Sequence, residues 1–433
     1  MCDTFVALSS ATANQSVIFA KSADCEVNEA NALVRIVRQK HVPGEVVRLT
    51  HMAIPQAQET YEVILTKAFW TYGCEIGINE HGLAMGEEAV YTTREKIDEK
   101  DGIIGPDLMR IGLERARTCR EAVEIMTALL EEYGQGGNGE MSGNSHFDSS
   151  FLLSDTHEAC ILETAGRDWA VRFIDDIGSI SNMLSIRSNW DRFSRATDST
   201  GPIDWAETYA RPEVPPTLGS PDRQSITYSR LAAAKGKISV QTAFDIMRHH
   251  NEGYHPAYAT AHQNICVHAG PQENRWWQAD GVMVTDVGDH GIMAWVTGTS
   301  GTCVSIFKPI FLGIELPDIG PLPTQNFDPD TLWWKHELLH RRAMADFDNL
   351  VTEIRHDFDQ IEAAFVAAAE TVKYGTDREK KEFTDYCFRK AMSATETWIE
   401  RLRTRHTLTF DDPAYRAMWR KYNAEAGLTG MPA

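Results

Sequence analysis

Two stretches near the start of the chain decide the fold: Cys2-Asp3-Thr4-Phe5-Val6-Ala7-Leu8 and Val17-Ile18-Phe19-Ala20-Lys21-Ser22-Ala23-Asp24. Each contains a run of apolar residues that favour strands. The segment between them, residues 9–16, is small and polar, as is typical of a turn. This pattern predicts a β-hairpin whose first strand begins almost at the start of the sequence, so that Cys2 is held at the edge or end of a sheet.

The hairpin pattern returns at residues 75–91, and two helical blocks are expected at residues 105–133 and 240–250. The Pro- and Ser-rich residues 201–225 are expected to form a long surface connection. Further strands are expected at residues 151–153, 159–162, 169–174, 180–186, 265–267, 281–287, 291–297 and 303–307. Strands on both sides of helical blocks, with few strand–helix–strand alternations, predict an α+β sandwich.

The composition changes near residue 325, which predicts a catalytic domain over residues 1–325 and a helical extension over residues 326–433. An apolar stripe recurs there every three or four residues: Phe347, Leu350, Ile354, Phe358, Ile361 and Phe365. Such a stripe is typical of one helix packing on the rest of the protein. It also fits a contact between two copies of the chain, and therefore a homo-oligomer.

Composition excludes several classes of protein. The 433-residue chain carries 62 acidic side chains against 42 Lys and Arg, a net charge of −20, so nucleic acid is not an expected partner. No apolar run is long enough for a membrane span, and the first residues lack the features of a secretory signal. The eight cysteines are scattered without a C-x-x-C pair, which predicts a cytoplasmic protein with reduced thiols.

Cys2 has a chemistry that no other cysteine of the chain shares. Removal of the initiator Met1 leaves a thiol and a free α-amine on one residue, and an N-terminal amine is a known activator of such a nucleophile. Lys21 and Asp24, at the returning end of the hairpin, would stabilise the thiolate and orient the amine. The alternatives are that Cys2 merely follows the start residue, and that Lys21 and Asp24 are ordinary solvated side chains.

The hairpin with Cys2 resembles the start of the secernin/dipeptidase family of N-terminal nucleophile hydrolases. Further segments resemble the family in the same order: Phe69-Trp70, Gly77-Ile78-Asn79-Glu80-His81-Gly82, Glu163-Thr164-Ala165-Gly166-Arg167, Ile180-Ser181-Asn182, Thr297-Gly298-Thr299-Ser300 and Leu332-Trp333-Trp334-Lys335-His336-Glu337. The resemblance implies a four-layer αββα sandwich and a dipeptidase or amidase activity. It extends more remotely to the bile-salt hydrolases and penicillin V acylases.

The resemblance also implies roles for individual residues. Cys2 matches the nucleophile, Asp24 the residue that contacts its amine, and Asn182 an Asn near the nucleophile that helps to stabilise the oxyanion. Glu88 falls near a second oxyanion-stabilising Asn of the acylases, and Arg230 near an Arg behind the nucleophile.

The chain departs from the family at Glu87-Glu88, where the family often has Asn-Glu. Two adjacent acids are poor oxyanion donors, so an unusual substrate, such as a cationic one, is one explanation. The other explanation is that Glu87 lies on the outer face, because the side chains of a strand alternate and only one of two neighbours points inward.

Histidines are concentrated in residues 249–268, at positions 249, 250, 255, 262 and 268. Their spacing matches no metal-binding motif, so no metal ion or other cofactor is expected. His268 is expected to line the cleft instead. The cysteines other than Cys2 are interpreted as small buried hydrophobes. The pairs Trp276-Trp277 and Trp333-Trp334 are expected in the core, with an aromatic substrate pocket as the alternative.

The sequence therefore predicts a cysteine-type amidohydrolase that cleaves small linear amides, most simply dipeptides, through an acyl-enzyme on Cys2. Two alternatives stay open. One is an acyltransferase, or an acylase of non-peptide amides, with the same nucleophile. The other is a non-catalytic, secernin-like interaction protein in which Met1 is retained or the amine is blocked.

Overall fold

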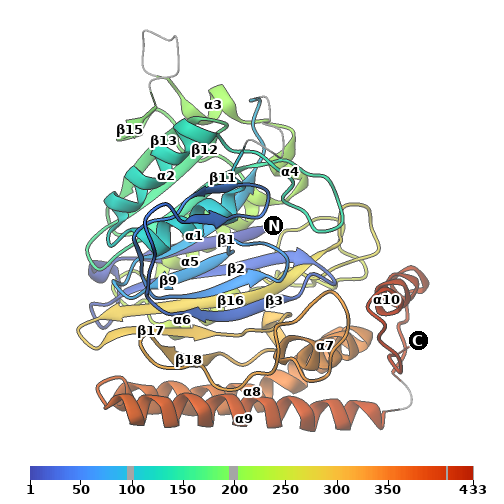
Figure 1. Ribbon diagram of the computed structural model, residues 1–433. Helices are drawn as coiled ribbons and strands as arrows, with labels where there is room; N and C mark the ends of the chain where they lie inside the picture. Colours follow the sequence, from blue (N-terminus) through green and yellow to red (C-terminus); the bar gives the residue numbers. More distant parts are fainter. Residues whose placement is uncertain (95–101, 195–202, 406–407, 433) are drawn as a thin grey trace.

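The computed structural model describes residues 1–94, 102–194, 203–405 and 408–432. Two antiparallel sheets form its centre (Figure 1). The six-stranded sheet has the order β14 (Ile177–Ser181), β1 (Cys2–Ala7), β2 (Val17–Glu26), β16 (Trp277–Gly288), β17 (Gly291–Val296) and β18 (Lys308–Phe311). The eight-stranded sheet has the order β15 (Arg192–Phe193), β13 (Asp168–Ile174), β12 (Ala159–Ala165), β11 (Asp148–Ser154), β10 (Ala84–Val90), β9 (Ile76–Asn79), β8 (Val63–Ala68) and β3 (Asn31–Ile36).

The two sheets are stacked face to face and covered by helices on their outer faces. One apolar core between the sheets contains Val6, Phe19 and Leu152. A second core joins the outer face of the eight-stranded sheet to α1 (Gly105–Arg115) and α2 (Cys119–Tyr133). A third core joins the six-stranded sheet to α5 (Ser220–Ala234), α6 (Val240–Met247) and α8 (Phe347–Val372). The expected four-layer αββα sandwich is therefore confirmed.

Strand alternation decides which way the first residues face. Phe5 lies in the core beneath the helices, whereas Val6 lies in the core between the sheets. Because successive side chains of a strand point to opposite faces, Cys2 faces the space between the sheets and Asp3 faces the helices. The β1–β2 hairpin pairs Cys2 with Ala23, as its sequence predicts.

Smaller elements complete the chain. Two two-stranded ribbons pair β4 (Gln39–Lys40) with β7 (Glu59–Thr60) and β5 (Val46–Arg48) with β6 (Ala53–Pro55). Three 3₁₀ helices are η1 (Ser9–Ala11), η2 (Thr302–Val304) and η3 (Met344–Asp346).

Three expectations about the middle of the chain were wrong. The described part of residues 201–225 forms α3 (Trp205–Tyr209), α4 (Val214–Thr217) and the start of α5 rather than a surface connection. Pro221 sits in the first turn of α5, where proline needs no amide hydrogen. Residues 265–267 form no strand, and residues 303–307 contain the end of η2 ahead of β18.

The C-terminal region consists of α7 (Leu332–Ala343), α8, α9 (Asp377–Arg403) and α10 (Pro413–Glu425). The long α8 and α9 lie along the β18 side of the molecule (Figure 1). The stripe from Phe347 to Phe365 packs into the core shared with the six-stranded sheet, as the intramolecular interpretation predicts. The domain boundary at residue 325 stays a prediction. Residues on both sides of it contribute to the same hydrophobic core. Among the described residues, no helix is long and apolar enough to cross a membrane.

Candidate active site

Cys2 is the first residue of β1 and lines a cavity at the end of the two sheets. Met1 is attached to it and lines the same cavity. The Met1 side chain packs with Leu218 and Val267, and Trp277 lies against this small apolar cluster. Met1 and Cys2 are only 7% and 5% exposed, so the thiol is covered while Met1 is present.

The cavity wall is strongly acidic. Six carboxyl side chains line it, from Asp24, Glu26, Glu29, Glu75, Glu87 and Glu140. These residues come from β2, β10 and the loops beside them, so the stacking of the two sheets brings them together. Carboxyl groups accept hydrogen bonds from an ammonium group, and a positive charge beside them favours their ionised form, so such a wall suits a ligand that carries a positive charge.

Asn182 contacts the backbone nitrogen of Cys2, the atom that becomes the α-amine when Met1 is removed. Its Oδ1 accepts a hydrogen bond from this nitrogen at 2.8 Å, and its Nδ2 donates to the Ala89 carbonyl oxygen at 2.9 Å. Because Nδ2 is engaged in this way, the contacts of Asn182 differ from those of the expected oxyanion donor. They suit a residue that positions the amine.

Arg223, on α5, contacts the backbone of Cys2 from the helix side of the sheet. Its guanidinium donates to the Cys2 carbonyl oxygen at 3.0 Å, to Asn182 Oδ1 at 2.8 Å and to the Asp3 carboxylate. Both Arg223 and Asp3 are fully buried. The expectation for Arg230 was wrong, because Arg230 lies two helical turns further on and is exposed, with its guanidinium against His249 Nδ1.

Asp24 lies on the helix side of β2 and reaches the cavity from there. The Met1 ammonium donates to the Asp24 carbonyl oxygen at 3.1 Å, and the carboxyl group accepts from Ser22 Oγ. Burial raises the pKa of the Asp24 carboxyl to about 7, against the lowering effect of the N-terminal ammonium and Arg223. An acid with this pKa, next to an amine, suits a proton-handling site.

Lys21 lies between the sheets, fully buried, with its ammonium 3.3 Å from Glu75. Burial raises the pKa of the Cys2 thiol to about 12, and Lys21 opposes this rise. Lys21 therefore lowers the pKa of the Cys2 thiol, as expected, but the desolvation of the buried thiol has the larger effect.

The two adjacent acids of β10 face opposite sides of the strand, as alternation predicts. Glu88 points between the sheets and accepts a hydrogen bond from Thr4, whereas Glu87 accepts from Ser149 at 2.6 Å and lines the cavity. Glu88 does not line the cavity, so the structure does not bring it to the expected oxyanion position.

Comparison with known proteins agrees with this geometry. Residues 1–198, which contain the hairpin, Cys2, Asp24 and Asn182, match the model of peptidase family C69. The resemblance to the secernin/dipeptidase family is thereby confirmed.

Two curated relatives are a dipeptidase of Bifidobacterium longum and a probable dipeptidase A of Streptococcus pyogenes. The first is 27% identical over 213 residues, which are 43% of this chain and 38% of the relative. The second is 27% identical over 144 residues, which are 31% of this chain and 29% of the relative. The match thus spans less than two-fifths of the length of either relative.

Two similar solved structures are a mutant conjugated bile acid hydrolase of Clostridium perfringens and a penicillin V acylase of Agrobacterium tumefaciens. The first has a TM-score of 0.47 at 13% identity and covers 76% of this chain and 98% of the hydrolase. The second has a TM-score of 0.42 at 14% identity and covers 73% of this chain and 87% of the acylase.

Of the remaining expected site residues, His268 does not line the cavity of Cys2. It is fully buried among His250, Cys303 and His340, beneath the six-stranded sheet. The Trp333-Trp334 pair is buried in a core of its own, as expected, whereas Trp277 borders the cavity. Arg223 and the wall residues Glu26, Glu29, Glu75 and Glu140 were missed from sequence, because no motif marks them.

The cavity carboxyls predict a pH-dependent stability. Burial raises the pKa of Glu29 and of Glu87 to about 8, far above the unfolded value of about 4.3. A raised pKa contributes stability that is complete below the unfolded pKa and is lost as the pH rises through the folded pKa. For each such carboxyl the loss is up to about 1.4 kcal/mol per pH unit.

Glu29→Gln is therefore expected to gain stability relative to the wild type between about pH 6 and pH 8. The melting temperatures of Glu29→Gln and the wild type are compared at each pH, so that the effect of all other titrating groups, which both proteins share, cancels in the difference. A difference in melting temperature that stays constant across this range would show that Glu29 is not held protonated in the fold.

Proposed function

We propose that this protein is a cysteine dipeptidase whose nucleophile is Cys2 after removal of Met1. The observation that carries the proposal is that Cys2 faces a cavity with a wall of carboxyl groups beside a small apolar pocket. The match of residues 1–198 to the model of peptidase family C69 and the relatives named dipeptidase support it. The proposed substrate is a dipeptide with a free amino group.

In the proposed reaction, the α-amine of Cys2 takes the thiol proton and the thiolate attacks the carbonyl carbon of the peptide bond. The carbon–nitrogen bond then breaks, and the leaving amine takes the proton from the α-ammonium. The resulting thioester is attacked by water, which gives a proton to the α-amine. The carbon–sulfur bond then breaks, the thiolate regains this proton from the α-ammonium, and the first amino acid leaves as a carboxylic acid that ionises in solution. Asn182 and Asp24 hold the amine, and Arg223 holds the backbone of Cys2 from behind.

Met1 indicates which part of a substrate the cavity suits. Its ammonium lies by the Asp24 backbone, and its unbranched apolar side chain packs with Leu218, Val267 and Trp277. Once Met1 has left, the first residue of a dipeptide, with an ammonium group and an apolar side chain, presents the same chemistry. The acidic wall therefore favours a dipeptide over the acyl chains of non-peptide amides.

Substrate panels test this proposal. We expect dipeptides with an unbranched apolar first residue to be cleaved, and their N-acetylated analogues to lose about 10–100-fold in kcat/KM, because a charge-assisted hydrogen bond contributes about 1.5–3 kcal/mol. Intact mass should show that Met1 is absent from the active protein. Equal or faster turnover of the acetylated compounds would favour an acylase, and product formation only with an added amine acceptor would favour acyl transfer.

A further inference from the structure

A second cluster of reactive side chains lies outside the cavity. His250, Cys266, His268 and Cys303 bring one nitrogen or sulfur atom each to a common point, with all four atoms within 4.8 Å of one another. His250, Cys266 and His268 lie in the irregular stretch between α6 and β16, and Cys303 lies on η2. None of the four lines the cavity of Cys2.

The distances within the cluster fit a tetrahedral metal site. His268 Nε2 lies 3.6 Å from Cys266 Sγ, 3.3 Å from Cys303 Sγ and 3.2 Å from His250 Nε2. Zinc binds sulfur at about 2.3 Å and imidazole nitrogen at about 2.0–2.1 Å, so ligand atoms around a tetrahedral zinc ion are about 3.3–3.8 Å apart. The three distances from His268 Nε2 are therefore close to the edge lengths of such a tetrahedron.

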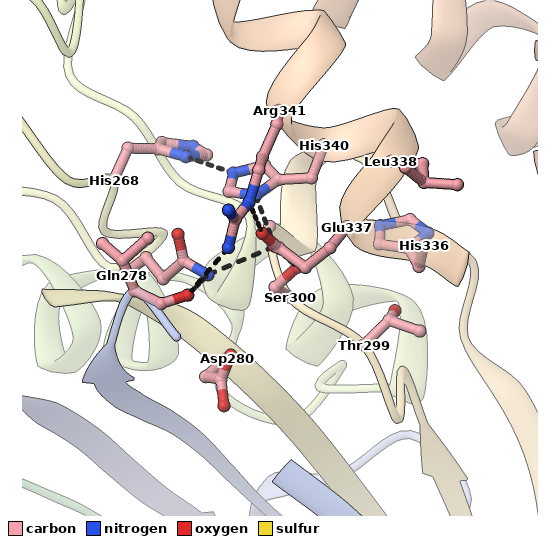
Figure 2. Close-up of polar contacts among 12 residues, drawn as sticks. His268, Gln278, Asp280, Thr299, Ser300, His336, Glu337, Leu338, His340 and Arg341 are labelled. Carbon is pink, nitrogen blue, oxygen red and sulfur yellow. Dashed lines mark hydrogen bonds and ion pairs between the residues drawn. The ribbon is translucent and has the colours of Figure 1, made fainter. Parts of the chain in front are cut away.

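A chain of hydrogen bonds fixes the orientation of His268 (Figure 2). Glu337 forms an ion pair with Arg341 and accepts from His340 Nδ1 at 2.8 Å. Because His340 Nδ1 donates to Glu337, His340 Nε2 is the nitrogen that faces His268 Nδ1, at 3.2 Å, and can accept a hydrogen bond from it. The lone pair of His268 Nε2 then points at the two thiols, as in metal-binding histidines whose other ring nitrogen donates to an outer partner.

The surrounding chain gives a reason for such a site. Residues 248–276, all of them described, contain no helix or strand. An irregular stretch longer than about 15 residues is uncommon in a compact domain unless something ties it down. Cys266 and His268 lie within this stretch, His250 near its start, and Cys303 on η2 across from it. A bound metal would cross-link these segments just before β16, whose first residue, Trp277, borders the active-site cavity.

We propose that His250, Cys266, His268 and Cys303 bind one Zn²⁺ ion in a closed, structural site. Two thiolates and two imidazoles are a common set of ligands for structural zinc, and their soft sulfur atoms disfavour Mg²⁺ and Ca²⁺. Cys266, His268 and Cys303 are buried, which suits a site with no open position for a substrate. The proposal is independent of the chemistry at Cys2.

The test is the metal content of the full-length protein, measured by inductively coupled plasma mass spectrometry. The protein is purified without added metal or chelator. We expect about one zinc ion per chain, and at least about a 10-fold lower content in Cys266→Ser and Cys303→Ser. Cys387→Ser, which removes an equally buried thiol on α9, and Cys2→Ser should both retain the metal. Loss of the dipeptidase activity alone would therefore leave this result unchanged.

A second measurement avoids the risk that ligand variants fail to fold. The wild-type protein, exchanged into Co²⁺, should show the absorption of tetrahedral cobalt with thiolate ligands. Three results would overturn the proposal: wild-type protein that retains no zinc or cobalt after incubation and dialysis, a metal content that is indifferent to Cys266→Ser and Cys303→Ser, or a disulfide between these two cysteines in the freshly purified protein.

Discussion

Cys2→Ser is expected to lower kcat/KM for dipeptides by at least about 10³-fold while leaving the fold intact, because a hydroxyl replaces the ionisable thiol that attacks the peptide bond. Serine is also small, so Met1 is still removed and the α-amine is retained. The variant thus separates the thiol from the amine. Kinetics on a dipeptide, with intact mass to confirm removal of Met1, measure this effect.

Cys25→Ser is the matched control, since Cys25 is a buried thiol that borders the same cavity. Its Sγ accepts a hydrogen bond from Asn31 at 3.3 Å, which a hydroxyl can also accept. This variant should keep most of the activity. Turnover that survives Cys2→Ser but is lost in Cys25→Ser would move the nucleophile to Cys25, and turnover indifferent to both would favour the interaction-protein alternative.

Arg223→Leu is expected to destabilise the protein by about 3–5 kcal/mol, because it leaves the Asp3 carboxylate buried without its charge partner. It also removes the donors to Cys2 and Asn182, so residual folded enzyme should have a lower kcat. Chemical denaturation and steady-state kinetics measure the two effects. Asp3→Asn combined with Arg223→Leu should recover part of the lost stability, because no unpaired charge remains.

Arg230→Leu provides the control on the same helix. Arg230 is exposed, so its replacement should change the free energy of unfolding by no more than about 0.5 kcal/mol. If Arg223→Lys folds, it should lie between wild type and Arg223→Leu in kcat, since lysine keeps the charge but not the planar fork of donors. A larger loss in Arg230→Leu than in Arg223→Leu would restore the sequence-based assignment.

Local patterns in the sequence predict several features of this protein. The alternation of β1 and β2 predicts both the hairpin and the burial of Cys2 at its end, because the period of a strand is set by the backbone alone. The apolar stripe of α8 predicts its buried face for the same reason, at the helical period. The alternation of Glu87 and Glu88 likewise predicts that only one of them reaches the cavity.

Other features depend on which segments the tertiary structure brings together. Arg223 reaches Cys2 from a stretch whose prolines and serines suggest a loop, and Arg230 has the same chemistry two turns away. The acidic wall and the cluster of His250, Cys266, His268 and Cys303 combine segments that no spacing rule connects. The sequence by itself determined the strand and helix periods and the reactive residue at the start of β1. Only the packing of the four layers decided which distant side chains converge on this residue. That packing depends on contacts throughout the core, so no short stretch of sequence predicts it.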